Sequence, residues 1–240
     1  MKIKFLSILL ITSFFVNGQD LNTPIITSGD SINSFIPENC RVIQIIEGDL
    51  NKDKINDVAI VFQDTNPSKI ELIKSGETII DTLDSNQRTL LVLIKDSLTN
   101  KYILKGQTNS FIIHRYSSFM NEPFQKISIK NNTLILDFFL WYSWGSWSQT
   151  ELQYIFRYQN DKITLVGAEY NEVHRGTSAG VQRSFNFLTK KMCETKSELD
   201  TNGEIRTKKP EWTNFMIKEL KTLETLSKPL DWIPINGIQL

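Results

Sequence analysis

Residues 42–62 contain the clearest structural pattern of this chain: Val42-Ile43-Gln44-Ile45-Ile46-Glu47-Gly48-Asp49-Leu50-Asn51-Lys52-Asp53-Lys54-Ile55-Asn56-Asp57-Val58-Ala59-Ile60-Val61-Phe62. Its two ends, residues 42–46 and 58–62, are rich in β-branched side chains, which favour strands. Its middle contains Asp and Asn residues, which favour turns because they hydrogen-bond their own backbone. The stretch therefore predicts a strand, an acidic loop and a second strand.

The acidic loop has the spacing of a cation site. Oxygen-bearing side chains occupy positions 1, 3, 5 and 9, counted from Asp49. Calcium takes about six to eight hard oxygen ligands, and a loop can supply them when every second side chain turns inward. We therefore predict that the side chains of Asp49, Asn51, Asp53 and Asp57 and the main-chain carbonyl of Ile55 bind calcium. The alternative is a solvated turn without an ion.

The arrangement of strand, D-x-N-x-D-x-x-x-D and strand resembles the calcium loop of the FG-GAP repeats of integrin propellers and of dockerin-like loops. The resemblance covers about 15 of the 240 residues and implies the same five ligands. The chain departs from that pattern at Lys54, where the family usually has Gly; a left-handed conformation costs a residue with a Cβ about 1 kcal/mol. It is not a full EF-hand, because Ile60 stands where that loop has a bidentate Glu. The loop also occurs only once, which argues against a propeller.

The N-terminus has the features of an export signal. Lys2 and Lys4 precede the apolar residues 5–16, and Gly18 is small enough for a cleavage site. The apolar run is shorter than the about 20 residues of a transmembrane span. We expect a signal peptide at residues 1–18, a secreted or periplasmic mature protein, and no transmembrane segment after cleavage.

The composition is nearly neutral, with 27 Lys and Arg residues and 27 Asp and Glu residues. A neutral chain gives no electrostatic reason to expect nucleic acid as a partner. Cys40 and Cys193 are the two cysteines. An even number in an exported protein permits one disulfide, and two free thiols are the alternative; the sequence leaves both open.

Residues 19–40 are polar and irregular and lead into a single β-rich domain at residues 41–240. In that domain, short apolar runs alternate with turn residues about every eight to twelve residues. The turns Lys130-Asn131-Asn132 and Gln159-Asn160-Asp161 predict hairpins. We therefore expect a mainly β fold of the α+β class, built as an antiparallel sheet, a sandwich or a partial barrel.

Residues 211–227 stand apart from the strands. Their apolar side chains are three or four residues apart, the spacing of one helix face: Trp212, Phe215, Met216, Leu220, Leu223 and Leu226. Pro210 suits the start of a helix and Pro229 its end. We expect a C-terminal amphipathic helix at residues 211–227 packed on the sheet, with a helix that binds a partner or a membrane surface as the alternative.

Residues 141–147 read Trp141-Tyr142-Ser143-Trp144-Gly145-Ser146-Trp147. Successive side chains of a strand point to opposite faces, so these rings do not all face one core. Exposed aromatic rings stack on sugars or anchor protein interfaces. Trp141, Tyr142, Trp144 and Trp147 are therefore candidate ligand contacts, and core packing is the alternative.

Residues 176–180 match G-x-S-x-G, the nucleophile motif of α/β-hydrolases. In those enzymes the catalytic histidine follows the serine, whereas His114 and His174 both precede Ser178. We therefore expect an exported, non-enzymatic binding or structural module with a structural calcium loop and a protein or glycan ligand. The alternative is an extracytoplasmic hydrolase that uses the acidic loop as a metal site or Ser178 as a nucleophile.

Overall fold

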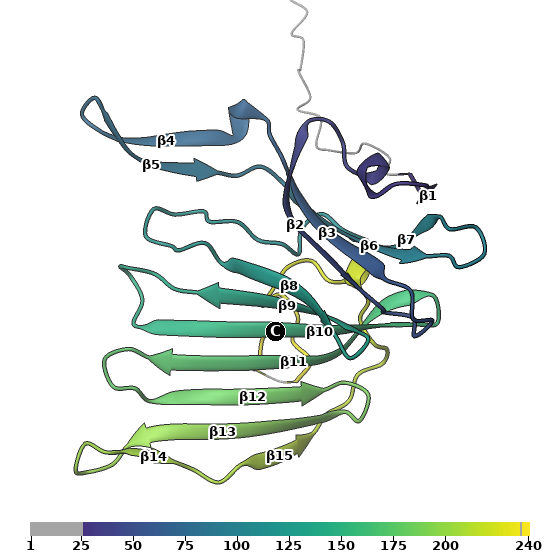
Figure 1. Ribbon diagram of the computed structural model, residues 1–240. Helices are drawn as coiled ribbons and strands as arrows, with labels where there is room; N and C mark the ends of the chain where they lie inside the picture. Colours follow the sequence, from purple (N-terminus) through teal and green to yellow (C-terminus); the bar gives the residue numbers. More distant parts are fainter. Residues whose placement is uncertain (1–25, 236) are drawn as a thin grey trace, which may run out of the picture.

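The computed structural model describes residues 26–235 and 237–240, and it consists mainly of antiparallel strands. Figure 1 shows two main sheets, the first built from the N-terminal half of the chain and the second from the C-terminal half. The prediction of a mainly β, antiparallel fold is confirmed. The expected signal peptide at residues 1–18 lies outside the described residues. Within the described part, no helix has the length and apolar character needed to span a membrane.

The first sheet has five strands in the order β1-β7-β6-β3-β2. Their bounds are β1 (Ser28–Gly29), β2 (Cys40–Gly48), β3 (Asp57–Asp64), β6 (Arg88–Lys95) and β7 (Tyr102–Thr108). The central strands β3 and β6 are buried along almost their whole length, which explains why their sequences are apolar without alternation. A short 3-10 helix, η1 (Ile32–Phe35), covers one face and buries Phe35.

A separate hairpin projects from the first sheet. It consists of β4 (Ile70–Ser75) and β5 (Thr78–Asp84) and follows the 3-10 helix η2 (Pro67–Lys69). Arg115 attaches it to the loop that leads into the second sheet, because its guanidinium donates to the Asp81 carboxylate at 2.6 Å and to the Thr82 carbonyl at 2.7 Å.

The second sheet has eight strands in the order β14-β13-β12-β11-β10-β9-β8, and β15 also pairs with β13. Their bounds are β8 (Phe124–Lys130), β9 (Thr133–Leu140), β10 (Ser148–Gln159), β11 (Lys162–His174), β12 (Gly180–Asn186), β13 (Lys191–Leu199), β14 (Ile205–Thr207) and β15 (Glu211–Asn214). Both predicted hairpins are present. Asn131 and Asn132 have φ of 50° and 58°, and Asn160 and Asp161 have φ of 51° and 62°, as two-residue turns that match the strand twist require.

The two sheets meet where β2 lies beside β8. The Gln44 side chain joins them: its Nε2 donates to the Ile127 carbonyl at 3.1 Å, and its Oε1 accepts from the Ile127 N–H at 2.8 Å. A β-bulge shifts the register of β2 between Val42 and Gln44, and bulges re-aim side chains in this way. The side-chain amide therefore takes the place of a backbone partner.

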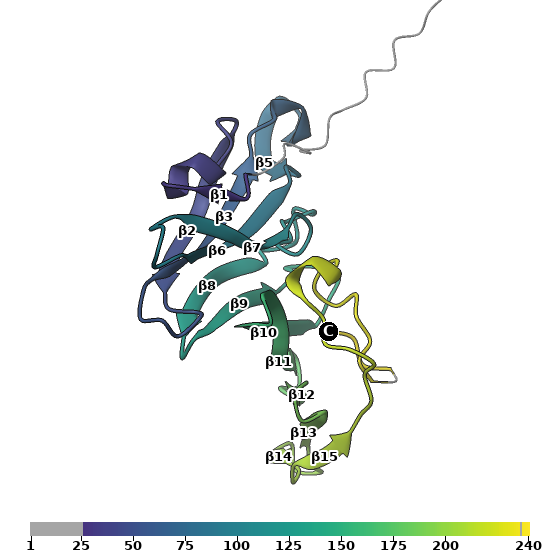
Figure 2. The same cartoon turned by 90° about the vertical axis from the view of Figure 1, so that its right-hand side faces the viewer.

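The C-terminal residues cover one face of the second sheet, as Figure 2 shows in yellow. Phe187 of this face meets Phe215 with ring centroids 5.9 Å apart and Trp232 with centroids 5.0 Å apart. The buried residues of both sheets and of this segment form the main core. This face of the second sheet is thus covered by the mostly irregular C-terminal segment and not by a helix.

The predicted helix at residues 211–227 is wrong. Residues 211–214 form strand β15, and the next regular element is the 3-10 helix η3 (Leu223–Thr225). Trp212 and Met216 are 70% and 92% exposed, whereas Phe215, Leu223 and Leu226 are buried. Residues 211–214 form a strand because the edge of β13 offers them backbone hydrogen-bond partners. The residues that follow cross the sheet as irregular chain, and they bury Phe215, Leu223 and Leu226 one at a time. Their spacing of three and four therefore did not mark a helix face.

Residues 111–114 are irregular although three of the four are apolar. They remain buried at Phe111 and Ile112. Phe111 packs edge-on against Tyr154 with centroids 4.9 Å apart. Their apolar character reflects this core contact and not strand pairing.

Both cysteines are free thiols, Cys40 in β2 of the first sheet and Cys193 in β13 of the second. Burial raises the pKa of Cys40 to about 11, and the negative charge of Asp64 adds to the effect.

We expect iodoacetamide to add two labels to the unreduced, denatured protein. In the folded protein at neutral pH, Cys40 should react more slowly than in the denatured protein, because the thiolate is the reactive form. Mass spectrometry measures both, and a denatured, unreduced chain that takes no label would show a disulfide instead.

Candidate functional site

The acidic loop folds around its own side chains. Asp49 accepts hydrogen bonds from the N–H groups of Lys52 at 2.5 Å and Lys54 at 3.0 Å. Lys52 and Lys54 have φ of 72° and 70°, which is the left-handed conformation. At Lys54 this conformation agrees with the Gly that the FG-GAP pattern usually has at that place. Asn51 accepts from the Asp53 N–H at 3.0 Å and donates its side-chain amide to the Asp53 carboxylate at 2.9 Å. The loop is therefore a compact turn tied by its own polar groups.

Asp57 anchors this turn to the first sheet. Its carboxylate is fully buried and accepts the N–H of Leu50 at 2.7 Å, of Asn51 at 3.3 Å and of Lys95 at 2.9 Å. Burial raises the pKa of Asp57, while the three N–H groups act in the opposite direction. The side chain that was expected to close an ion site thus fixes the start of the loop to the end of β6.

The donor set of the loop fits calcium in chemical type. Carboxylate and amide oxygens keep lone pairs after the hydrogen bonds described above. Within the described residues, no Lys or Arg side chain forms an ion pair with Asp49, Asp53 or Asp57. The described ranges also contain no group of three or more His, Cys, Asp or Glu side chains placed to hold a metal ion. The loop side chains would therefore have to turn toward one point, and calcium binding stays a prediction.

The four candidate aromatic residues lie in the loop between β9 and β10. Trp144 and Trp147 are 72% and 67% exposed, whereas Trp141 and Tyr142 are partly buried. The structure therefore gathers these rings in one loop and leaves two of them exposed to solvent.

Arg175, which directly follows β11, holds this loop in place. Its guanidinium lies 5.1 Å from the centre of the Trp141 ring and donates to the carbonyls of Tyr142, at 2.9 Å, and Ser146. Its backbone N–H donates to the Trp147 carbonyl at 2.8 Å. The neighbouring His174 ring stacks on Trp147 with centroids 6.0 Å apart. The exposed Trp144 and Trp147 thus belong to a loop whose backbone is held by hydrogen bonds to Arg175.

A second loop adds two more rings. The hydroxyl groups of Tyr116 and Tyr142 are 2.5 Å apart, and the rings of Phe119 and Trp144 have centroids 5.4 Å apart. The Ser143 N–H donates to the Phe119 carbonyl at 2.7 Å. We call this surface the aromatic platform: Tyr116, Phe119, Trp141, Tyr142, Trp144 and Trp147, supported by His174 and Arg175.

Sequence reasoning missed Tyr116, Phe119 and the role of Arg175. The only signal was two aromatic residues close together in a polar stretch, Arg115-Tyr116-Ser117-Ser118-Phe119. Nothing in the sequence showed that this stretch lies against residues 141–147.

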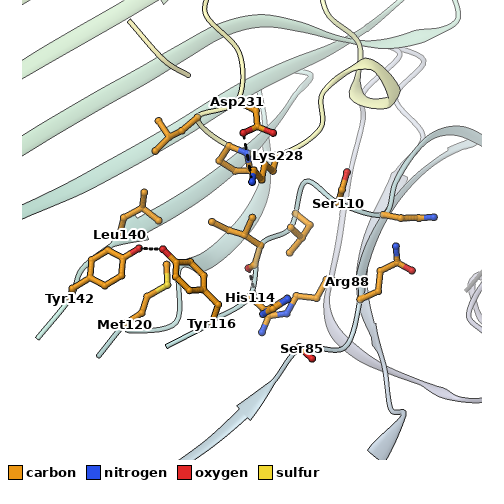
Figure 3. Close-up of a pocket in the computed structure, with 16 residues that line it drawn as sticks. Ser85, Arg88, Ser110, His114, Tyr116, Met120, Leu140, Tyr142, Lys228 and Asp231 are labelled. Carbon is orange, nitrogen blue, oxygen red and sulfur yellow. Dashed lines mark hydrogen bonds and ion pairs between the residues drawn. The ribbon is translucent and has the colours of Figure 1, made fainter. Parts of the chain in front are cut away.

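A cleft of about 560 Å³ opens beside the platform, between residues 85–88, residues 109–120 and residues 228–231. Figure 3 shows Tyr116 and Tyr142, which belong to both the platform and the cleft, and the ion pair between Lys228 and Asp231. Arg88 is 8% exposed. It binds Glu122 through two hydrogen bonds of 2.6 and 2.9 Å and donates to the Ile113 carbonyl at 3.0 Å. Its Nε has no partner among the described residues.

Tyr142 is a hydrogen-bonding group and not an acid at neutral pH. Burial raises the pKa of its phenol, and the hydrogen bond with Tyr116 raises it further. The Tyr142 hydroxyl therefore stays protonated. The two hydroxyl groups share one hydrogen bond, which leaves one hydrogen of the pair free to donate.

Ser178 lies in a hairpin loop between the antiparallel strands β11 and β12, and not in a turn from a strand to a helix. Its φ is 57°, and its N–H donates to the His174 carbonyl at 2.7 Å. The His174 Nδ1 lies 3.1 Å from the Thr177 hydroxyl. In the described chain, no hydrogen bond joins the Ser178 hydroxyl to a histidine, and this geometry does not form the nucleophile–base pair of a hydrolase.

The chain matches no known family model, no curated protein and no solved structure. Its function therefore has to be inferred from the residues and contacts described above.

Replacing Asp57 should weaken the whole fold. Asp57→Ala leaves three N–H groups without an acceptor, at about 1–3 kcal/mol for each buried group, so we expect the free energy of unfolding to fall by about 3 kcal/mol or more. Asp57→Asn should cost less, because one oxygen remains. Urea denaturation measures both changes. The control, measured in EDTA so that calcium does not contribute, is Asp53→Asn on the exposed part of the loop, with an expected change within about 0.5 kcal/mol; equal effects at the two positions would contradict the anchoring role.

Proposed function

We propose that this protein is an exported, non-enzymatic binding module that contacts a protein or glycan ligand with the aromatic platform. The observation that supports the proposal is the exposure of Trp144 and Trp147 on a loop that Arg175 holds in place. Large aromatic side chains dominate binding interfaces because each buries much area for few rotatable bonds.

The rigidity of the platform adds to this argument. Ordering flexible side chains and loops on binding costs free energy. Here the loop is already tied by hydrogen bonds to Arg175 and by the bond between Ser143 and Phe119. A ligand would therefore meet rings whose positions are set before it arrives, which is the arrangement of a binding surface.

We also propose that the acidic loop takes up a structural calcium ion, with Asp49, Asn51, Asp53, Ile55 and Asp57 as its residues. The support is electrostatic: the described residues provide no Lys or Arg ion pair for the three carboxylates. The negative charge of Asp53 also contributes to the raised pKa of Asp57. A divalent ion would offset this repulsion and stabilise the turn between β2 and β3.

The platform proposal is tested by a double substitution, Trp144→Ala with Trp147→Ala. Wild-type protein is first screened on a glycan array and against a displayed peptide library. We expect the double variant to bind the selected ligands at least tenfold more weakly, because the exposed rings provide most of the contact area. Affinity is measured by calorimetry, and thermal melting verifies that the variant folds.

The matched control is Trp212→Ala, since Trp212 is 70% exposed but lies on β15 at the far edge of the second sheet. This variant should keep wild-type affinity. Unchanged affinity in the double variant would show that the platform is not the binding surface.

Calcium should raise the melting temperature of the mature protein, and EDTA should lower it. At about 1 mM calcium and the affinity of extracellular calcium modules, the expected gain is about 0.4–1.4 kcal/mol. Asp53→Asn should reduce the calcium-dependent shift, because it removes one charged ligand. Equal melting temperatures in calcium and in EDTA would remove the calcium proposal.

A further inference from the structure

The cleft beside the platform has the size and position of a ligand subsite. Its volume of about 560 Å³ falls within the range of about 300–1,000 Å³ that small-molecule sites occupy. Tyr116 and Tyr142 line its wall and also belong to the platform. A single extended ligand can therefore lie on the exposed rings and place one end in the cleft.

The charges of the cleft are already paired. Arg88 is bound by both carboxylate oxygens of Glu122, and the Lys228 ammonium lies 3.8 Å from the Asp231 carboxylate. Among the described lining residues, His114 is the remaining ionisable group apart from the tyrosines. A charged ligand would therefore lose its hydration in the cleft without gaining an unpaired Lys, Arg, Asp or Glu as a partner. A neutral ligand does not carry this desolvation cost.

The hydrogen-bonding groups of the cleft include both donors and acceptors. The Arg88 guanidinium is not one of these groups, because it already donates to Glu122 and to the Ile113 carbonyl and its Nε is buried. The His114 Nδ1 lies 3.0 Å from the Arg115 carbonyl; because a carbonyl can only accept, Nδ1 carries the hydrogen, and Nε2 of the neutral ring is an acceptor. The Tyr116 and Tyr142 pair has one hydrogen left to donate. Hydroxyl groups, which both donate and accept, complement this mixture.

The remaining wall is apolar and includes Ile112, Met120, Leu140 and Pro229. Sugar rings combine hydroxyl groups with apolar C–H faces, and such faces stack on aromatic rings. Building on the platform function proposed above, we infer that the ligand is an uncharged glycan chain, with one sugar residue in the cleft and the next ones on Tyr142, Trp144 and Trp147. A protein ligand is the competing outcome.

The test titrates the mature protein with neutral hexasaccharides of glucose, mannose, galactose and N-acetylglucosamine by calorimetry. Hexagalacturonate and its fully methyl-esterified form serve as a charged and uncharged pair of one sugar chain. We expect saturable binding of at least one uncharged hexasaccharide. We also expect hexagalacturonate to bind at least tenfold more weakly than that ligand and no better than its methyl ester.

Two substitutions probe the cleft. His114→Ala removes the acceptor at Nε2, and Tyr142→Phe removes a hydroxyl group but keeps the ring. Each should weaken binding of the same hexasaccharide at least fivefold, while Trp212→Ala should leave it unchanged. Thermal melting verifies that the variants are folded.

Three results would overturn the inference: no saturable binding of any uncharged hexasaccharide at millimolar concentration, tighter binding of hexagalacturonate, or selection of peptide ligands alone. Unchanged affinity in both cleft variants, with loss in the variant that combines Trp144→Ala and Trp147→Ala, would reject the cleft subsite but leave the platform function intact. Unchanged affinity in that double variant would instead reject the platform function itself.

Discussion

The hydrogen bonds between the Gln44 side chain and the backbone of Ile127 join the edge strands β2 and β8, where the two sheets meet beside the core that they share. Nearby, the Asn132 side chain donates to the Asp49 carbonyl at 2.8 Å, so the acidic loop belongs to the same junction. Gly48 fits there because a Cβ would lie 2.7 Å from the Ile129 side chain. The relative position of the sheets, and with it the cleft between residues 85–88 and residues 109–120, depends on this junction.

The buried carboxylate of Asp57 and the buried guanidinium of Arg88 play comparable roles at the two ends of β3 and β6. Asp57 collects three backbone N–H groups, and Arg88 binds Glu122 and the Ile113 carbonyl. Buried charges persist in proteins when they are hydrogen-bonded or paired. Each therefore fixes an irregular segment to a rigid sheet: the acidic loop in one case and the stretch that carries Tyr116 and Phe119 in the other.

Much of the fold followed from local sequence patterns. The hairpins at Asn131-Asn132 and Asn160-Asp161 were predictable because few residues accept positive φ at both central positions of a turn. The same reasoning failed for residues 211–227, because an apolar spacing of three and four fits a helix face and also fits an extended chain that buries Phe215, Leu223 and Leu226 one at a time. The choice between a helix and an extended chain depends on the edge of β13 and on the face of the second sheet that this segment covers. Both are formed by residues outside the segment, so its own sequence does not show them.

Local sequence was enough for the strands on either side of the acidic loop, for the two hairpin turns and for the aromatic composition of residues 141–147, since these depend on the residues themselves and on their immediate neighbours. It was not enough for strand β15. Only the tertiary structure decided that Asp57 points into the protein as an anchor, that Arg175 supports the tryptophan loop, and that Tyr116 meets Tyr142. These contacts, including the one between Asp57 and Lys95, join residues that are far apart in the chain, and their formation depends on how the strands and sheets pack. The cleft and the meeting of the two aromatic loops are therefore products of packing, whereas local sequence showed only the aromatic residues of positions 141–147.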